Sequence, residues 1–192
     1  MAAKGRSPRI IAGEAGGRRL AVPLGDGVRP TSDRVKESLF SALGPGRLVG
    51  ARVLDLYAGS GALGLEALSR GAAAAVFVER DAAAARAVRT NIDTLGFADR
   101  AVLRVGAAAA VLNGPPPGGP FDLALLDPPY DRAASEVEAV LGGLAAGGWL
   151  SATATIVVER AAGSSPLRWP AGWGSIWERC YGDTLVLFAQ QE

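Results

Sequence analysis

The chain has 192 residues, with 20 lysines and arginines against 19 aspartates and glutamates, no histidine and a single cysteine, Cys180. This composition excludes disulfide frameworks, Cys/His zinc sites and Ser-His or Cys-His nucleophiles, so we expect no metal, and chemistry must come from carboxylates, backbone groups, tyrosine or arginine. The length fits one domain with a substantial core, and a polar, basic start without an apolar run of about 18 residues predicts a cytoplasmic protein that does not contact membranes.

The positive charge gathers at the start of the chain. Residues 1–36 hold eight basic and only three acidic side chains, which indicates a polyanionic partner. Within this segment, the sequence predicts a basic hairpin of two short strands over 9–22. A helix is expected over 31–43, and its apolar stripe leaves Arg34 and Lys36 free to meet solvent or a ligand.

From residue 51 onward, strand patterns alternate with helix patterns, which predicts a parallel sheet with helices on both faces. The expected strands are 53–57, 74–79, 101–105, 121–126, 154–159, 176–180 and 184–189, and the expected helices are 62–70, 82–95, 107–112 and 133–145. The last two strands should pair in antiparallel fashion. Trp169, Trp173 and Trp177 should pack against the edge of the sheet.

A glycine-rich turn follows the first strand of this series. Gly59, Gly61 and Gly64 occupy the positions of a G-x-G-x-x-G pattern, which lets a ligand approach the first peptide groups of the next helix. Asp55 lies inside the strand before the turn, where a carboxylate must serve the loop or a ligand. Glu79 ends the second strand and should accept the hydroxyls of a ribose. Together these residues predict a nucleotide cofactor.

The second informative stretch is a buried strand that ends in Asp127-Pro128-Pro129-Tyr130. Two consecutive prolines remove two N–H donors, which leaves carbonyl acceptors beside a carboxylate and an aromatic ring. Such a set can accept two hydrogen bonds and stack on a planar group. The tetrapeptide therefore predicts a site for a base that bears an exocyclic amine.

These motifs resemble the class I S-adenosylmethionine-dependent methyltransferases. The last tetrapeptide is similar to the (Asp/Asn)-Pro-Pro-(Tyr/Phe) motif of those that methylate the amino groups of bases. The whole chain resembles the bacterial 16S rRNA (guanine(966)-N2)-methyltransferase family. The segments that carry this resemblance are 9–13, 17–20, 29–40 and 54–71.

The resemblance implies a Rossmann-like α/β fold, in which a seven-stranded sheet with one antiparallel strand forms a methyltransferase domain over 31–192 behind a basic arm over 1–30. It implies transfer of a methyl group from S-adenosyl-L-methionine to the N2 amine of a guanine, with S-adenosyl-L-homocysteine as product. The expected partner is 16S rRNA in the small ribosomal subunit or a late assembly intermediate, and the protein is expected to be a monomer.

The residues expected in the site fall into three groups. Catalytic roles are expected for Asp127, Pro128, Pro129 and Tyr130. Cofactor contacts are expected from Asp55, Tyr57, Ala58, Gly59, Ser60, Gly61, Glu79, Arg80, Gly106, Ala107 and Asp127. RNA contacts are expected from Arg9, Arg18, Arg19, Arg29, Thr31, Arg34 and Lys36. The family would normally place a polar side chain at Gly106 for the adenine amine, so this departure leaves adenine recognition to backbone groups or to another part of the site.

Three other functions compete with this one. A DNA methyltransferase of adenine or cytosine would use the same tetrapeptide, although no recognition domain is evident in 192 residues. An NAD-dependent oxidoreductase would share the glycine pattern, but this sequence contains neither a histidine nor a Tyr-x-x-x-Lys pair to serve such an enzyme. An RNA-binding or assembly protein without catalytic activity would not need the intact tetrapeptide.

Overall fold

The computed structural model describes residues 7–23 and 32–192. The helices are α1 (Asp33–Leu43), the 3₁₀ turn η1 (Pro45–Arg47), α2 (Ala62–Ser69), α3 (Ala82–Leu95), α4 (Ala108–Val111) and α5 (Ala134–Ala146). The strands are β1 (Arg52–Leu56), β2 (Ala74–Glu79), β3 (Ala101–Val105), β4 (Phe121–Leu126), β5 (Leu150–Ala161), β6 (Trp173–Tyr181) and β7 (Thr184–Gln191). In this part of the chain, no helix is long and apolar enough to cross a membrane.

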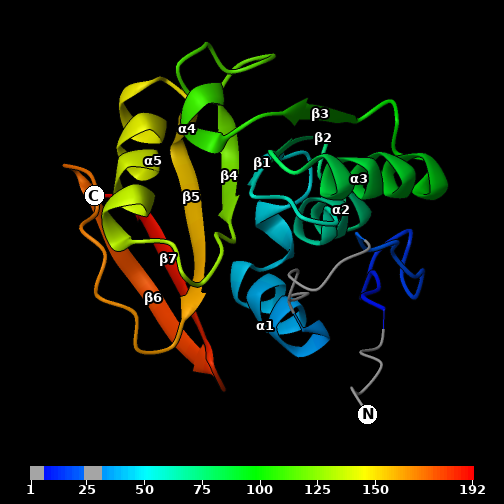
Figure 1. Cartoon of the computed structure of the whole chain (residues 1–192), viewed down its shortest axis with the longest axis horizontal. Coiled ribbons are helices and arrows are strands. Elements are labelled where there is room, and N and C mark those ends of the chain that lie inside the picture. Colours follow the sequence, from blue (N-terminus) through cyan, green and yellow to red (C-terminus); the bar gives the residue numbers. More distant parts are fainter. Residues whose placement is uncertain (1–6, 24–31) are drawn as a thin grey trace.

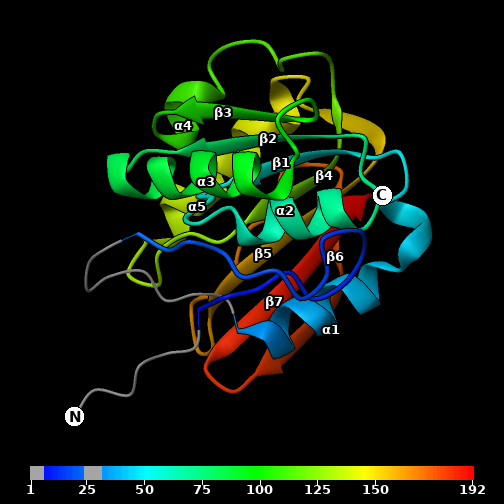
Figure 2. The same cartoon turned by 90° about the vertical axis from the view of Figure 1, so that its right-hand side faces the viewer.

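All seven strands form one sheet in the order β3-β2-β1-β4-β5-β7-β6. The strands β1 to β5 pair in parallel, whereas β7 runs antiparallel to both of its neighbours. Figures 1 and 2 show α1, α2 and α3 on one side of the sheet and α4 and α5 on the other. The core accordingly splits into two apolar clusters, one under each layer of helices. The predicted seven-stranded sheet with one antiparallel strand is confirmed.

The predicted strands and helices of this series are all present, with small shifts at their ends. The strands β2, β3 and β4 have the predicted bounds, while β5 and β6 are longer at both ends than expected. Pairing with β7 accounts for the extension of β6 and of the end of β5, while the start of β5 pairs with β4 through Leu150 and Phe121. The hydrophobic pattern of the sequence therefore predicted where each strand lies, but not where β5 and β6 begin and end.

The tryptophans pack on the sheet as expected, but on opposite faces. Trp173 belongs to the apolar cluster beside α5, while Trp177 packs against the cluster beside α2. The centroids of the Trp177 and Phe188 rings are 4.6 Å apart. Residues four apart in a regular strand share a face. Here the register shifts between Ser175 and Trp177, so that Ile176 is an extra residue and the alternation of faces is reversed.

The predicted N-terminal hairpin is wrong in its strands. Within the described residues 7–23, one isolated antiparallel bridge joins Arg9 to Arg19, and no strand forms. The segment instead binds α2 through polar contacts. Glu66 of α2 is fully buried and accepts hydrogen bonds from the backbone N–H groups of Ile11 (2.7 Å) and Ala12 (3.1 Å). Backbone hydrogen bonds still join residues 8–10 to residues 17–20, from Ile10 to Arg18, Gly17 to Ile10 and Leu20 to Pro8. The arm is thus a short hairpin without regular strands, held against α2 by Glu66.

A second set of contacts brings the arm against the end of α2. The hydroxyl of Ser69 accepts a hydrogen bond from the N–H of Ala15 and donates one to the carbonyl of Ala12. Gly13 lies so close that a Cβ atom there would be 1.8 Å from the carbonyl oxygen of Ser69. Only glycine fits this position, where φ is +84°. In Figure 2 the arm accordingly runs alongside α2.

Lys36 does not reach solvent, which corrects the expectation for this residue. Its side chain is buried on α1, and its ammonium group donates a hydrogen bond to the carbonyl of Arg9. Burial lowers the pKa of Lys36, while the negative charges of Glu66 and Asp33 oppose that shift. The arm covers this side of α1, so a position outside the apolar stripe became an interior one. Arg34 is exposed, as expected.

The buried carboxylate of Glu66 is predicted to be essential for holding the arm. Glu66→Ala would remove the acceptor of two backbone N–H groups and of the Arg70 guanidinium, which lies 2.6 Å away. Loss of a buried, multiply bonded carboxylate should lower the free energy of unfolding by about 2 to 4 kcal/mol. Urea unfolding measures this change. Glu37→Ala, at an exposed position on α1, is the control and should cost far less; equal costs would contradict the prediction.

Candidate active site

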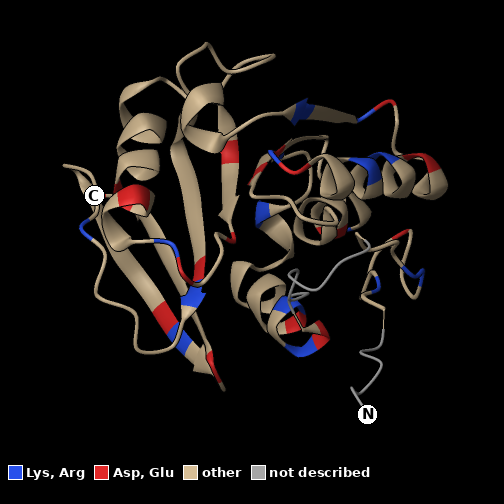
Figure 3. Ribbon diagram, in the orientation of Figure 1, with Lys and Arg blue, Asp and Glu red and all other residues tan. Residues whose placement is uncertain are grey.

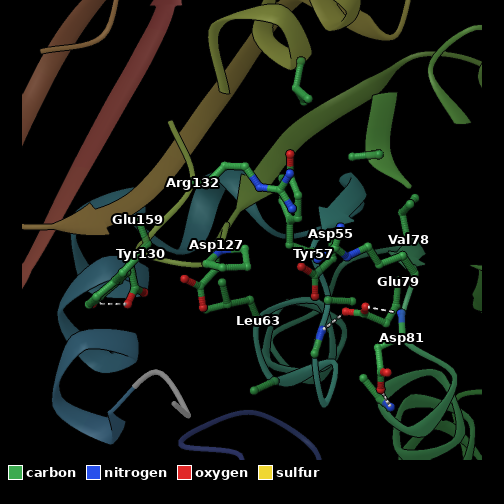
Figure 4. A pocket seen from close by; sticks show the side chains of 18 of the residues that line it. Asp55, Tyr57, Leu63, Val78, Glu79, Asp81, Asp127, Tyr130, Arg132 and Glu159 are labelled. Carbon is green, nitrogen blue, oxygen red and sulfur yellow. Dashed lines mark hydrogen bonds between the residues drawn. The ribbon is translucent and has the colours of Figure 1, made fainter. Parts of the chain in front are cut away.

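A cavity of about 810 Å³ opens at the carboxyl ends of the parallel strands. Its walls come from the loop after β1, the end of β2, the loop after β3, the tetrapeptide after β4 and the ends of β5 and β7. Figure 4 shows side chains from these elements converging, with Asp55, Tyr57 and Glu79 on one side of Asp127, and Tyr130 and Glu159 on the other. The cavity therefore has two ends that meet at Asp127. We call them the glycine-loop end and the tyrosine end.

A buried carboxylate joins β1 to the start of α2, the helix that follows residues 57–61, which we call the glycine loop. Asp55 Oδ2 accepts a hydrogen bond of 2.8 Å from the N–H of Gly64 in the first turn of α2. A Cβ atom at Gly64 would lie 2.4 Å from the ring of Phe77 and 3.0 Å from Asp55 Oδ2, so the position requires glycine. Burial raises the pKa of Asp55 to about 8; the Gly64 hydrogen bond opposes the shift, and the charges of Asp127 and Glu79 add to it.

Glu79 organises the turn at the glycine-loop end. Its two carboxylate oxygens accept hydrogen bonds of 2.8 Å each, one from the N–H of Gly59 and one from the N–H of Asp81. Asp81 in turn caps α3 by accepting from the N–H of Ala84. Each oxygen of a carboxylate has a second lone pair, so Glu79 can still accept hydrogen bonds from a ligand. The turn after β1 and the start of α3 are thus set by one side chain.

The start of α2 presents backbone donors to the cavity. Gly61, at φ +80°, occupies the N-cap position and supplies no side chain to cap the helix. The neighbouring residues Ser60, Ala62 and Leu63 line the cavity. Backbone N–H groups at a helix start favour anionic groups such as a carboxylate. Just before the loop, Tyr57 has φ +63° although it is not glycine, which indicates local backbone strain at the cavity wall.

Asn91, a residue that the sequence analysis did not single out, holds the loop between β1 and α2 through a hydrogen bond. Asn91 of α3 is buried and donates hydrogen bonds of 2.9 Å to the carbonyls of Ser60 and Ala21, while its own oxygen accepts from the N–H of Ala21. One side chain therefore joins the glycine loop to the N-terminal arm. Its position in the middle of an amphipathic helix gives no sign of this role.

The tetrapeptide after β4 lies beside the glycine loop because β1 and β4 pair in parallel. Leu56 faces Leu126 in the register of the two strands, so the loops that follow them start side by side. Asp127 and Pro129 line the cavity, whereas Pro128 is buried and does not line it. The negative charge of Asp127 adds to the raised pKa of Asp55.

The tyrosine end draws on the C-terminal strands. The hydroxyl of Tyr130 lies 2.7 Å from Thr184 Oγ1 and donates to Glu159 Oε1 at 3.4 Å. Tyr181 also lines this part of the cavity. No local pattern could have identified Glu159, Tyr181 or Thr184, because the antiparallel pairing of β7 with β5 and β6 brings them to the tetrapeptide from far along the chain.

Most residues expected to contact a cofactor do line the cavity. They are Asp55, Tyr57, Ala58, Gly59, Ser60, Glu79, Arg80, Gly106, Ala107 and Asp127. Gly61 lies at the start of α2 without lining it. Arg132 also lines the cavity and pairs with Glu136 four residues later on α5; this acid–base pair at helical spacing was a local signal that the sequence interpretation did not use.

The residues expected to contact RNA lie elsewhere. Arg9, Arg18, Arg19 and Arg34 are exposed on the arm and on α1, whereas Arg29 and Thr31 lie outside the described residues. Arg9 pairs with Asp33 at 2.9 Å, and the guanidinium of Arg18 donates to the carbonyl of Thr94. Basic and acidic residues accordingly alternate on α1 in Figure 3.

The loop after β3 has room for a side chain at Gly106, the position where the family would normally have a polar residue. A Cβ atom at Gly106 would contact only Val111, at 3.4 Å, and the backbone there is not in the left-handed region. The absence of a side chain is therefore not required by packing.

In the described part of the chain, no group of three or more His, Cys, Asp or Glu side chains is arranged to hold a metal ion.

Comparison with known proteins identifies close relatives over nearly the whole chain. A family model described as conserved hypothetical protein 95 matches residues 8–190. Ribosomal RNA small subunit methyltransferase D from Escherichia coli is 39% identical over 184 residues, which cover 96% of this chain and 90% of the relative. The protein of the same name from Haemophilus influenzae is 38% identical over 175 residues, covering 91% and 89%.

Solved structures agree with these relatives. The structure of the Escherichia coli protein yhhF has a TM-score of 0.82 and 40% identity, and the match covers 96% of this chain and 97% of that one. A ribosomal protein L11 methylase from Lactobacillus delbrueckii has a TM-score of 0.64 at 16% identity, covering 91% and 84%. The second likeness is one of fold alone.

The raised pKa of Asp55 predicts that the fold loses stability as the pH rises. Between its ordinary pKa of 3.8 and about 8, the folded state keeps a proton that the unfolded state releases. The free energy of unfolding should therefore fall by about 1.4 kcal/mol per pH unit from this one group. Asp55→Asn can still accept from Gly64 but cannot titrate, so its urea midpoint should depend less on pH than that of the parent between about pH 5 and about pH 7. Identical pH profiles for the two proteins would exclude this assignment.

Proposed function

Because this chain belongs to the family of ribosomal RNA small subunit methyltransferases, we propose that it transfers a methyl group from S-adenosyl-L-methionine to the N2 amine of a guanine in 16S rRNA. Methyltransferase activity, with S-adenosylmethionine as the methyl donor, follows from family membership. The position of Asp127 in the cavity, next to the glycine loop, supports an exocyclic amine of a base as the acceptor. The choice of guanine N2 rests on the resemblance of the chain to the 16S rRNA guanine-N2 methyltransferase family. The small subunit, or a late intermediate of its assembly, is the proposed substrate particle.

The residues at the glycine-loop end fit this cofactor. Glu79 has lone pairs for the ribose hydroxyls, and the start of α2 offers N–H donors for the carboxylate of the methionine part. Gly59 and Gly61 have positive φ and keep the turn free of side chains. Adenine would lie toward Gly106 and Ala107, where only backbone groups are offered by these two residues. When bound, the cofactor supplies an electrophilic methyl group on a sulfonium.

The residues at the centre of the cavity would act on the amine. The N2 amine of guanine is a weak nucleophile because its lone pair is delocalised into the ring. The carboxylate of Asp127 and the carbonyl of Pro128 would accept its two hydrogens, which favours a tetrahedral nitrogen and directs the lone pair at the methyl group. Tyr130 would stack on the base, a contact that contributes on the order of 1 to 3 kcal/mol. The base has to leave its stack to reach this cavity.

The exposed arginines of the arm and α1 are the proposed contacts to RNA phosphates. Arg18 and Arg19 lie on the arm and Arg34 lies on α1, and the buried contact of Lys36 with Arg9 holds these two elements together. Since Lys36 is buried, we withdraw it from this surface. The segment 1–30 would thus serve as an RNA-binding arm of the methyltransferase domain.

The direct test is methyl transfer in vitro with labelled S-adenosylmethionine. Small ribosomal subunits from cells that lack this gene, deproteinised 16S rRNA and duplex DNA should be offered in parallel. We expect label in 16S rRNA, and mapping of the modified nucleotide should find N2-methylguanine. Label in DNA, or on a nucleotide other than guanine, would refute the proposed acceptor while leaving the methyltransferase assignment intact.

Asp127→Ala is predicted to lower turnover by about 10²-fold or more, the usual effect of losing a positioned proton acceptor. Cofactor binding should survive, because the contacts of Glu79 and the α2 start do not depend on Asp127. Single-turnover methylation and equilibrium titration of the cofactor measure the two effects separately. Asp93→Ala, an exposed acid on α3, controls for loss of negative charge. Turnover at the parental rate would remove Asp127 from the site.

Replacing Arg18, Arg19 and Arg34 together with alanine should weaken RNA binding and flatten its salt dependence. Each lost phosphate contact reduces the slope of log affinity against log salt by about 0.7 to 0.9, so the slope should change by about 2. Filter binding over a range of salt concentrations gives this slope. The control removes three exposed arginines elsewhere, Arg104, Arg168 and Arg179. If both triple variants change the slope equally, the arm has no special role in RNA binding.

A further inference from the structure

Tyr130 is tied through its hydroxyl to two strands at the C-terminal end of the sheet. Its oxygen lies 2.7 Å from the hydroxyl of Thr184, the first residue of β7, and donates to Glu159 of β5 at 3.4 Å. Both partners are buried and line the cavity. They follow Tyr130 by 54 and 29 residues, so this contact exists only because β5 and β7 pair. Figure 4 shows Tyr130 and Glu159 together at this end of the cavity.

The contact matters because Tyr130 lies in a loop. It follows β4 and precedes α5, and its neighbours Pro129 and Asp131 are exposed. A ring in such a loop would have to be ordered each time a base enters, and ordering a side chain costs conformational entropy. A ring already held by its hydroxyl avoids that cost. Stacking alone needs no hydroxyl, so the bonds of the Tyr130 oxygen have a purpose other than the stack itself.

Neither partner has to touch the base for this effect. Thr184 and Glu159 meet the hydroxyl, the end of the ring farthest from the backbone of the tetrapeptide. The loop fixes one end of the ring and the two strands fix the other. The long axis of the ring is thereby set relative to Asp127, three residues earlier in the same tetrapeptide.

From this geometry we infer that Thr184 and Glu159 are positioning residues that hold the ring of Tyr130 in place for the acceptor base. The inference rests on the proposed transfer to a base amine. It assigns to the antiparallel pair β5–β7 a direct part in building the acceptor end of the site.

A double-mutant cycle tests the inference, with Thr184→Val, Tyr130→Phe and the two combined. Valine has the shape of threonine without the hydroxyl, so the fold should persist, and an unchanged dissociation constant for S-adenosylmethionine verifies this in each variant. Each single change should lower kcat/KM for the 16S rRNA substrate by about five- to tenfold, the range expected for one hydrogen bond. The double variant should be no worse than the poorer single variant, because the same bond is lost.

Two further variants separate the hydroxyl from packing. Thr184→Ser keeps the hydroxyl and should stay well above Thr184→Val in kcat/KM. Thr155→Val is the matched control, because Thr155 is also a buried threonine of this sheet, and its hydroxyl contacts Arg47 outside the cavity. It should not change kcat/KM for RNA.

Additive losses in the cycle would overturn the inference, as would a serine variant no better than the valine variant. Either result, obtained with a parent protein that methylates 16S rRNA, overturns the positioning role alone. A parent that binds S-adenosylmethionine but transfers no methyl group to this RNA would overturn the proposed function, and the positioning role with it.

Discussion

The parallel pairing of β1 with β4 is the constraint on which the site depends. The two strands adjoin at the point where the order of the sheet reverses, with β2 and β3 on one side and β5 on the other. Loops that leave adjacent parallel strands in opposite directions open a crevice at their carboxyl ends. The glycine loop and the Asp127 tetrapeptide meet there because of strand order, although 64 residues of chain, 57–120, lie between the two strands. A donor and an acceptor site can thus share one cavity without a second domain.

Buried polar side chains then fix the loops that this topology brings together. Glu79 sets the glycine loop against α3, and Asn91 joins that loop to the arm. Glu66 fastens the arm to α2. Each of these groups is costly to bury unless its bonds are made, so each favours one arrangement over nearby alternatives. The arm and the glycine loop are therefore parts of one polar network, linked at Asn91.

Much of this could be predicted from the sequence because the relevant signals are local. The buried runs of β2, β3 and β4, the glycine pattern after β1 and the acceptor set at Asp127 are each contained in a few consecutive residues, and the order of strands follows from the alternation with helices. What failed depends on distant partners. The sequence pattern places Lys36 at the surface, because it does not show that the arm covers this side of α1. It also does not show that Glu66 binds the N–H groups of Ile11 and Ala12 and so attaches the arm to α2. Thr184 carries no local signal, because only the pairing of β7 with β5 brings it to Tyr130.

The extra residue in β6 has a consequence for how the molecule meets its neighbours. The strand β6 forms one border of the sheet, and a straight border strand would offer a row of unpaired peptide groups to another chain. Ile176 interrupts that row: it breaks the spacing of the outward-facing N–H and C=O groups and adds local twist. A second molecule cannot continue the sheet in register across this interruption. The same irregularity that sends the two tryptophans to opposite faces thus protects the protein against edge-to-edge aggregation.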